Sequence, residues 1–390
     1  MITHPVLSDE VIGRVQRRLV DRGQSPDPQA LAQALRAESS MLMSDAEMLG
    51  LIRELQRELV GAGPLADLLA DPSTTDVVVN SPTDVRVDRG AGWEPAPVRF
   101  ADEAAVQRLA RRLATAAGRR LDDAHPHVDA RLADGTRLHA VLAPVAASGT
   151  CLSLRVLRPV RHDLAALVDA GSLPGATLPA VTAMLRARLA FLVSGGTGSG
   201  KTTLLSALLT AVPAHERVVT VEDAEELRPP HPHVVRLVAR QANVEGAGTI
   251  SMRDLVRQAL RMRPDRLVVG EVRGAEVVDL LAAMNTGHEG GAGTVHANTA
   301  ADVPARLEAL AALGGIERAA LHSQLAGAVR VVLHVRRRGA QRELAEIALL
   351  GRGSDGWVSA QPAVIAGRPQ EPGAARLAAL LAERGEPCPW

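Results

Sequence analysis

Residues 189–203 read LAFLVSGGTGSGKTT, an apolar run that leads into a glycine-rich loop, a lysine and two threonines. The apolar run is short enough for a buried strand, and the residues after the loop suit a helix. The loop matches the pattern G-x-x-x-x-G-K-[ST], which binds phosphate when it lies between a strand and a helix. We therefore predict a P-loop here, against the alternative of a flexible glycine turn.

The residue types in this loop suit a nucleoside triphosphate. Glycines let backbone N–H groups approach phosphates closely, and the following helix adds the positive end of its dipole. Lys201, the only lysine in the chain, offers a compact charge for the β- and γ-phosphates. The Thr202 hydroxyl can ligate Mg²⁺ directly. The nucleotide-binding residues predicted from this pattern are Gly195, Gly196, Thr197, Gly198, Ser199, Gly200, Lys201 and Thr202.

Two other apolar runs end in acids. The segment RPDRLVVGE, residues 263–271, has the form of a Walker B strand, and Glu271 at its end could polarise the attacking water or hold Mg²⁺ through water. Residues 218–223 end in Glu222 and Asp223. Their alternative interpretation is a helix N-cap with solvated charge.

A glycine-rich segment, GHEGGAGTVHAN at 287–298, carries two histidines eight residues apart. Its glycines indicate close backbone packing against a ligand or a neighbouring strand. His296 could sense the γ-phosphate through a hydrogen bond. Zinc binding is disfavoured because no cysteine or third histidine is suitably spaced.

Arginines offer the chemistry that neutralises phosphate charge across an interface. Arg137 and Arg155 lie on predicted strands of the first half, and Arg236 and Arg240 follow a strand of the second half. Solvated surface charge is an equally good interpretation of any one of them.

Hydrophobic patterning divides the chain into five regions. We predict a helical N-terminal region over 1–60, an α+β domain over 61–160, a linker over 161–176, an α/β domain over 177–366 and a peripheral tail over 367–390. Alternation of strands and helices in the fourth region predicts an α/β fold with a mainly parallel sheet.

Composition narrows the function. Lys plus Arg and Asp plus Glu are 44 each, and aromatic residues make up 1%. A balanced charge and few aromatics disfavour single-stranded nucleic acid binding. We expect no transmembrane segment, because no apolar stretch approaches the roughly 20 residues that span a bilayer. Two distant cysteines suit a reducing, cytoplasmic location.

Taken together, the motifs GGTGSGKTT, VEDAEEL, LRMRPDRLVVGEVRGAE and NTGHEGGAGTVHANT, in this order, resemble the type II/IV secretion ATPase superfamily. The nearest likeness is to Tad/CpaF-type ATPases of Flp-pilus and conjugation-related systems, and it covers roughly residues 60–350. The family usually has serine where Gly291 stands.

This resemblance implies a RecA-like ATPase domain over 177–366, preceded by a PAS-like domain over 61–160, and it adds Thr203 to the nucleotide-binding residues. It implies an ATP- and Mg²⁺-dependent hydrolase that forms a hexameric ring at the inner face of the cytoplasmic membrane. Its partners would be inner-membrane platform proteins of a pilus or secretion system, with no direct nucleic acid. The implied site residues are Lys201, Glu222, Glu271 and His296 for catalysis, Glu222, Asp223 and Glu226 for an acidic box, and His288 and His296 for a histidine box. Arg137 and Arg155 would contact the γ-phosphate, and Arg236 and Arg240 would lie at an interface or the nucleotide.

Other functions stay open at this point. The main alternative is an ATP-dependent DNA-transfer or helicase-type motor. A non-hydrolysing assembly module is disfavoured by Glu271, and a small-molecule kinase by the lack of a lid-like substrate domain.

Overall fold

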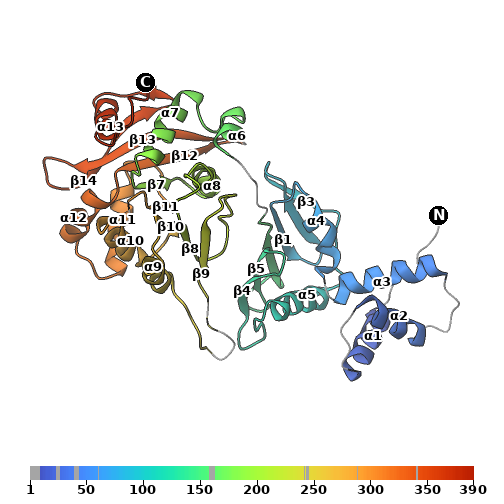
Figure 1. Cartoon of the computed structure of the whole chain (residues 1–390). Coiled ribbons are helices and arrows are strands. Elements are labelled where there is room, and N and C mark those ends of the chain that lie inside the picture. Colours follow the sequence, from blue (N-terminus) through green and yellow to red (C-terminus); the bar gives the residue numbers. More distant parts are fainter. Residues whose placement is uncertain are drawn as a thin grey trace. The chain divides into compact units, whose positions relative to one another are not determined.

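A computed structural model describes residues 9–22, 27–38, 44–59, 61–157, 163–240, 242, 246–287, 289–339 and 341–390. The chain divides into two compact units, Met1–Arg158 and Pro159–Trp390. Figure 1 shows the elements of each unit. Within the described residues, no helix is both long and apolar enough to cross a bilayer.

Three helices open the first unit, and their apolar faces form one small core. They are α1 (Asp9–Asp21), α2 (Pro28–Glu38) and α3 (Asp45–Leu59). Val15, Leu31 and Leu55, one from each helix, have no exposed surface. Packing of this kind, rather than helix propensity alone, stabilises helices of such length.

The rest of the first unit is a six-stranded antiparallel sheet with a helix packed on one face. The strands follow the order β3-β2-β1-β6-β5-β4. Asp102 caps helix α5 (Glu103–Ala116) by accepting from Ala105 N–H, and Leu109 and Leu113 pack into the core of the sheet. The other elements are η1 (Gly63–Leu65), α4 (Ala66–Ala70), β1 (Asp76–Ser81), β2 (Asp84–Asp88), β3 (Trp93–Pro95), β4 (His127–Arg131), β5 (Arg137–Val141) and β6 (Cys151–Arg155).

The second unit is built on a nine-stranded sheet in the order β15-β14-β13-β12-β7-β11-β10-β8-β9. Neighbours from β12 to β9 are parallel, and β13, β14 and β15 add an antiparallel edge. The strands are β7 (Phe191–Ser194), β8 (Val218–Glu222), β9 (Val234–Val238), β10 (Arg266–Val272), β11 (Ala292–Val295), β12 (Val331–Arg338), β13 (Gln341–Arg352), β14 (Val358–Ile365) and β15 (Arg368–Pro369).

Helices cover both faces of this sheet. Phe191 and Val193 face one core, whereas Leu192 between them faces the other, so β7 is buried on both sides. The first core contains residues of α6 (Leu164–Asp169), α7 (Leu178–Arg186), α8 (Lys201–Thr210) and α13 (Gly373–Ala382), and a short turn η2 (Gly175–Thr177) precedes α7. The second contains residues of α9 (Met252–Leu260), α10 (Glu276–Asn285), α11 (Val303–Leu313) and α12 (Arg318–Ala328). The α/β class and the mainly parallel sheet predicted from the sequence are confirmed.

Two regional assignments from the sequence are wrong. The described part of the predicted linker 161–176 contains α6, and Leu164 and Leu167 are buried in the core of the second unit. The predicted peripheral tail contains α13, whose Leu377 and Leu381 are at most 1% exposed. In both segments the apolar residues recur at helical spacing over too few residues to be distinguished from a loop.

Candidate active site

The glycine-rich loop joins β7 to α8 and requires glycine at two positions. At Gly195 a Cβ atom would collide with the Val335 carbonyl oxygen and lie 2.5 Å from the Ser199 hydroxyl. At Gly200 φ is +97°, a left-handed conformation that glycine adopts without strain. Helix α8 begins at the next residue, so its first-turn N–H groups, which lack intrahelical partners, follow the loop directly.

Lys201 lies over this loop. Its ammonium donates to the carbonyl oxygens of Gly195, at 3.1 Å, and Gly196, at 2.9 Å. Lys201 is 8% exposed, and this burial lowers its pKa. A phosphate is a stronger partner for an ammonium than two neutral carbonyls, because both groups are charged.

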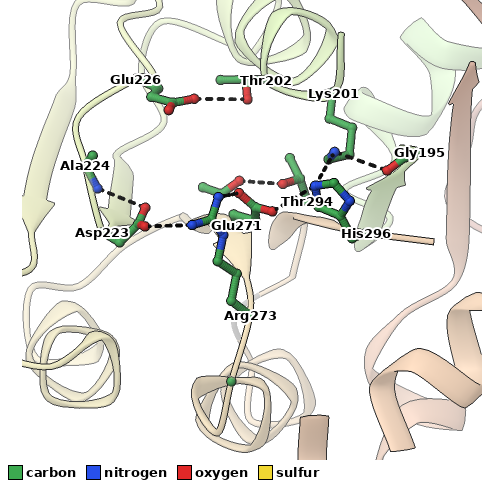
Figure 2. A network of polar contacts seen from close by, with 12 residues as sticks. Gly195, Lys201, Thr202, Asp223, Ala224, Glu226, Glu271, Arg273, Thr294 and His296 are labelled. Atoms are coloured by element: carbon green, nitrogen blue, oxygen red, sulfur yellow. Dashed lines mark hydrogen bonds and ion pairs between the residues drawn. The ribbon is translucent and has the colours of Figure 1, made fainter. Parts of the chain in front are cut away.

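His296 connects Lys201 to Glu271 (Figure 2). Its Nε2 atom lies 3.1 Å from Lys201 Nζ and 3.3 Å from Glu271 Oε1. Burial, together with the charge of Lys201, lowers the pKa of His296. The imidazole is therefore neutral at neutral pH, and its Nε2 either accepts from Lys201 or donates to Glu271. One nitrogen thus links the Lys201 ammonium to the Glu271 carboxylate.

The second oxygen of Glu271 is held by an arginine. Arg273 Nη2 lies 2.5 Å from Glu271 Oε2, and Arg273 Nη1 lies 3.2 Å from Asp223 Oδ2. Strands β8 and β10 are parallel neighbours, with Val221 opposite Val269. Their carboxyl ends therefore bring Asp223 and Glu271 to the same edge of the sheet.

Glu222, the last residue of β8, is 2% exposed. Its Oε1 accepts from the N–H groups of Glu226 and Leu227, each at 3.0 Å, whereas Oε2 has no hydrogen-bond partner among the described residues. Burial raises the pKa of Glu222 to about 7. This carboxyl group is neither solvated nor a helix cap, so the alternative interpretation of it is wrong.

A small cavity of about 10 Å³ lies beside Glu222, with room for about one water-sized particle. Its lining residues are Thr202, Glu222, Asp223, Ala224, Glu226, Gly270 and Glu271. The Thr202 hydroxyl is 3.5 Å from Glu226 Oε2. A hydroxyl and several carboxylates are oxygen donors of the kind Mg²⁺ takes. The described residues contain no group of three or more His, Cys, Asp or Glu that could hold a metal by themselves.

These residues fit a nucleoside triphosphate. The Ser199 hydroxyl is buried without a partner in the described chain, and the loop precedes a helix N-terminus. Lys201, Glu271 and the cavity beside Thr202 lie around the end of the same loop.

Comparison with known proteins identifies the family. The model of the type II/IV secretion system protein family matches residues 58–352. The chain belongs to this family. A putative conjugal transfer protein of Mycobacterium tuberculosis is 61% identical to this secretion protein over 350 residues, covering 88% of this chain and 99% of the relative.

More distant relatives agree with this assignment. The VirB11 protein of Agrobacterium fabrum is 31% identical to this secretion protein, over 73% of this chain and 91% of VirB11. The crystal structure of the pilus retraction motor PilT with bound ADP has the same fold, with a TM-score of 0.51 and 22% identity over 82% of this chain and 85% of PilT. The ATPase motor of a secretion or pilus system predicted from the sequence is confirmed at the level of the family.

The structure of this secretion ATPase brings together most of the predicted site residues of its second unit. Lys201, Glu271 and His296 form one network, and Glu222, Asp223 and Glu226 line the cavity beside it. His288 lies outside the described residues.

Predicted arginines are placed as follows. Arg137 and Arg155 are direct cross-strand neighbours on β5 and β6 of the first unit. Arg236 Nε lies 3.6 Å from Glu225 Oε1, and Arg240 Nε donates to the Gly248 carbonyl oxygen at 2.7 Å. Their roles toward a nucleotide or another subunit stay predictions.

Two arginines at the site were missed by sequence reasoning. Arg273 follows Glu271 by two residues, and that spacing at a strand end was a usable signal. Arg342 on β13 donates to the Gly198 carbonyl of the loop at 3.0 Å. It lies 144 residues away, and no local pattern connects it to the loop.

Proposed function

We propose that this ATPase powers pilus assembly or protein export, with hydrolysis at the end of β10. The observation that supports this most is the link from Lys201 through His296 to Glu271. Through this link the Glu271 carboxylate contacts the same imidazole as Lys201, the side chain proposed to bind the phosphates. In a P-loop enzyme, catalysis is mostly positioning and neutralisation of charge.

The proposed roles follow from chemistry. Lys201 binds the phosphates, and Glu271 orients the attacking water and accepts its proton. Thr202 would hold Mg²⁺ directly and Glu271 through water, and the ion supplies charge neutralisation when bound. Glu222 and Glu226 border the cavity and orient water there. The contact between His296 and Lys201 would break when Lys201 binds a phosphate, so His296 would respond to the presence of nucleotide.

The nucleoside would occupy a larger cavity beside the loop, of about 260 Å³. Ser199, Gly200 and Thr203 of the loop and of the start of α8 form one side of it. Leu167 and Val335 add apolar surface, which suits the faces of a base.

We propose a homo-oligomeric ring, of six subunits by resemblance, of the Tad/CpaF type. Arg137 and Arg155 are proposed to contact the γ-phosphate and to neutralise its charge. Arg236 and Arg240 are proposed at subunit interfaces. The ring would act at the inner face of the cytoplasmic membrane on platform proteins of the system.

A second candidate is a motor for DNA transfer, and the relatives favour it. The M. tuberculosis relative bears the name of a putative conjugal transfer protein. Turnover stimulated at least several-fold by single-stranded DNA would support this candidate, whereas turnover indifferent to DNA would support protein export.

Steady-state ATP hydrolysis across a protein concentration series, paired with light scattering for mass, tests the proposal. We expect turnover to rise as the ring assembles and to disappear in Glu271→Gln, which retains nucleotide binding. Normal hydrolysis by Glu271→Gln would remove Glu271 from catalysis. If a monomer hydrolyses ATP at a rate per subunit that does not depend on protein concentration, arginines of a neighbouring subunit have no role in turnover.

A further inference from the structure

We propose that Arg273 is a positioning residue that ties Glu271 to Asp223 and so fixes the catalytic carboxylate. The inference rests on the proposed role of Glu271. In the described structure Arg273 makes no hydrogen bond or ion pair with the loop or with Lys201. Its charge helps to lower the pKa of Lys201 and of His296, and its direct partners are Glu271 and Asp223. Figure 2 shows its guanidinium between the two carboxylates, at the carboxyl ends of two strands.

The contact uses the fork of the guanidinium. Nη2 meets Glu271 Oε2 at 2.5 Å, and Nη1 meets Asp223 Oδ2 at 3.2 Å. Two nitrogens of one planar group therefore join two carboxylates from separate strand ends. A lysine ammonium is a point charge on a flexible stem and would not hold both with this geometry.

The backbone that carries Arg273 is itself anchored. The N–H groups of Arg273 and Gly274 both donate to Glu276 Oε1, at 2.6 and 2.8 Å. Glu276 is only 7% exposed, so a buried carboxylate fixes the turn between β10 and α10. A Cβ at Gly274 would lie 3.1 Å from Glu276 Oε2, so a larger residue there would require the Glu276 side chain to shift. The Arg273 side chain starts from a rigid point although it is itself 54% exposed.

Electrostatics explain why such an anchor is useful. Lys201 attracts Glu271, and this attraction acts to raise the pKa of Lys201. Without a counter-attraction, Glu271 would close on the ammonium that has to bind phosphate. Arg273 pulls the opposite oxygen toward Asp223, so that His296 lies between Glu271 and Lys201. The pull keeps the ammonium and the carboxylate available for separate tasks.

The test compares Arg273→Ala, Arg273→Lys, Asp223→Asn and the double variant Arg273→Ala/Asp223→Asn in the full chain. We expect Arg273→Ala to lower kcat roughly 10- to 100-fold, as misplacement of a reacting group does. Nucleotide affinity, measured with a fluorescent ATP analogue, should stay within about threefold, since no phosphate contact is lost. Arg273→Lys should remain impaired, and the double variant should be no slower than Arg273→Ala, because in this proposal Asp223 acts on Glu271 through Arg273.

A matched control separates this role from general stability. Arg186 and Glu386 form an ion pair at 2.8 Å with side-chain exposures of 53% and 16%, close to the 54% and 19% of Arg273 and Glu271. Arg186→Ala should leave kcat unchanged.

Three results would overturn the proposal. An Arg273→Ala protein with unchanged kcat would exclude a role for Arg273 in positioning Glu271. One with a raised kcat would mean that Arg273 slows ATP hydrolysis. If the fold-losses in kcat of the two single variants multiply in the double variant, Asp223 and Arg273 act independently. Glu271→Gln is measured alongside. If it hydrolyses ATP normally, the proposed catalytic role of Glu271 fails as well, and if it is inactive while Arg273→Ala is normal, only the positioning role fails.

Discussion

Gly270, near the end of β10, lies directly against the side chain of Glu222 at the end of β8. A Cβ atom on Gly270 would lie 2.6 Å from Glu222 Cγ and 3.0 Å from Glu222 Oε1. The Gly270 carbonyl also accepts from the Thr294 hydroxyl at 2.7 Å, which ties β10 to β11 at this point. The glycine before Glu271 is therefore required by a neighbouring strand and not by its own backbone conformation.

Gly270→Ala should displace the Glu222 side chain from the Glu226 and Leu227 N–H groups. Overpacking of this kind costs about 1–3 kcal/mol, and we expect a lower melting temperature together with reduced ATP turnover. The control is Gly50→Ala in α3, where an added Cβ meets nothing within 4 Å. That change should be neutral or stabilising by up to about 1 kcal/mol. Equal melting temperatures for the two variants would contradict the steric conflict.

Glu222→Gln should change how stability depends on pH. Burial raises the pKa of Glu222 from 4.5 to about 7, so the folded protein holds this proton over a pH range in which the unfolded chain has lost it. The cost of burying the carboxylate is thus absent below about pH 4.5 and fully present above about pH 7, where it amounts to about 3 kcal/mol.

Glutamine removes this cost because it is neutral at every pH, and its carbonyl oxygen can accept from the same two N–H groups. We expect Glu222→Gln to melt at a higher temperature than the wild type at pH 8 and at nearly the same temperature at pH 5. Nucleotide-free protein is melted at both values, with Glu225→Gln, a more exposed acid of the same segment, as the control. A constant difference between the two pH values would show that Glu222 is not protonated near neutrality.

Lys201 should be the single side-chain target of an amine-directed reagent, because the chain has no other lysine. Burial lowers its pKa, which increases the fraction of reactive free amine near neutral pH. Saturating ATP should protect Lys201, whereas the N-terminal amine should be labelled equally with and without ATP. Peptide mass mapping after a short exposure measures both sites. Labelling of Lys201 that ATP leaves unchanged would place the phosphates elsewhere.

Local patterns predicted the centre of the fold and the site. The P-loop follows a strand buried on both faces, and the acids follow apolar strands, so each motif carried its own structural context. Strand register then brought Glu222, Asp223 and Glu271 together without further information, because parallel strands end at one edge of a sheet.

Contacts made by distant segments could not be predicted. Arg342 reaches Gly198 only because β13 pairs with β12 beside the loop. Helix α13 is rich in alanine, and its burial depends on a sheet edge formed by residues 341–369. Arg273 was visible in the sequence, but its partner Asp223 depends on the pairing of two strands some 50 residues apart.

Arg266, at the start of β10, should matter for stability rather than for catalysis. Its guanidinium is buried, with Nε 2.6 Å from Glu216 Oε2 and Nη2 donating to the Leu185 carbonyl at 2.7 Å. Arg266→Ala would leave Glu216, 4% exposed, with Arg188 as its remaining ion-pair partner among the described residues. Removal of one member of a buried pair costs about 3–5 kcal/mol, whereas the exposed pair lost in Arg186→Ala is worth at most about 1 kcal/mol.

Thermal melting should therefore separate the two variants clearly, and the nucleotide affinity of folded Arg266→Ala should match that of the wild type because Glu271 lies near the other end of the strand. Replacing both members, as Arg266→Met with Glu216→Leu, should restore most of the loss, since an apolar pair removes the unpaired charge. Equal melting temperatures for Arg266→Ala and Arg186→Ala would mean that Arg188 alone satisfies Glu216.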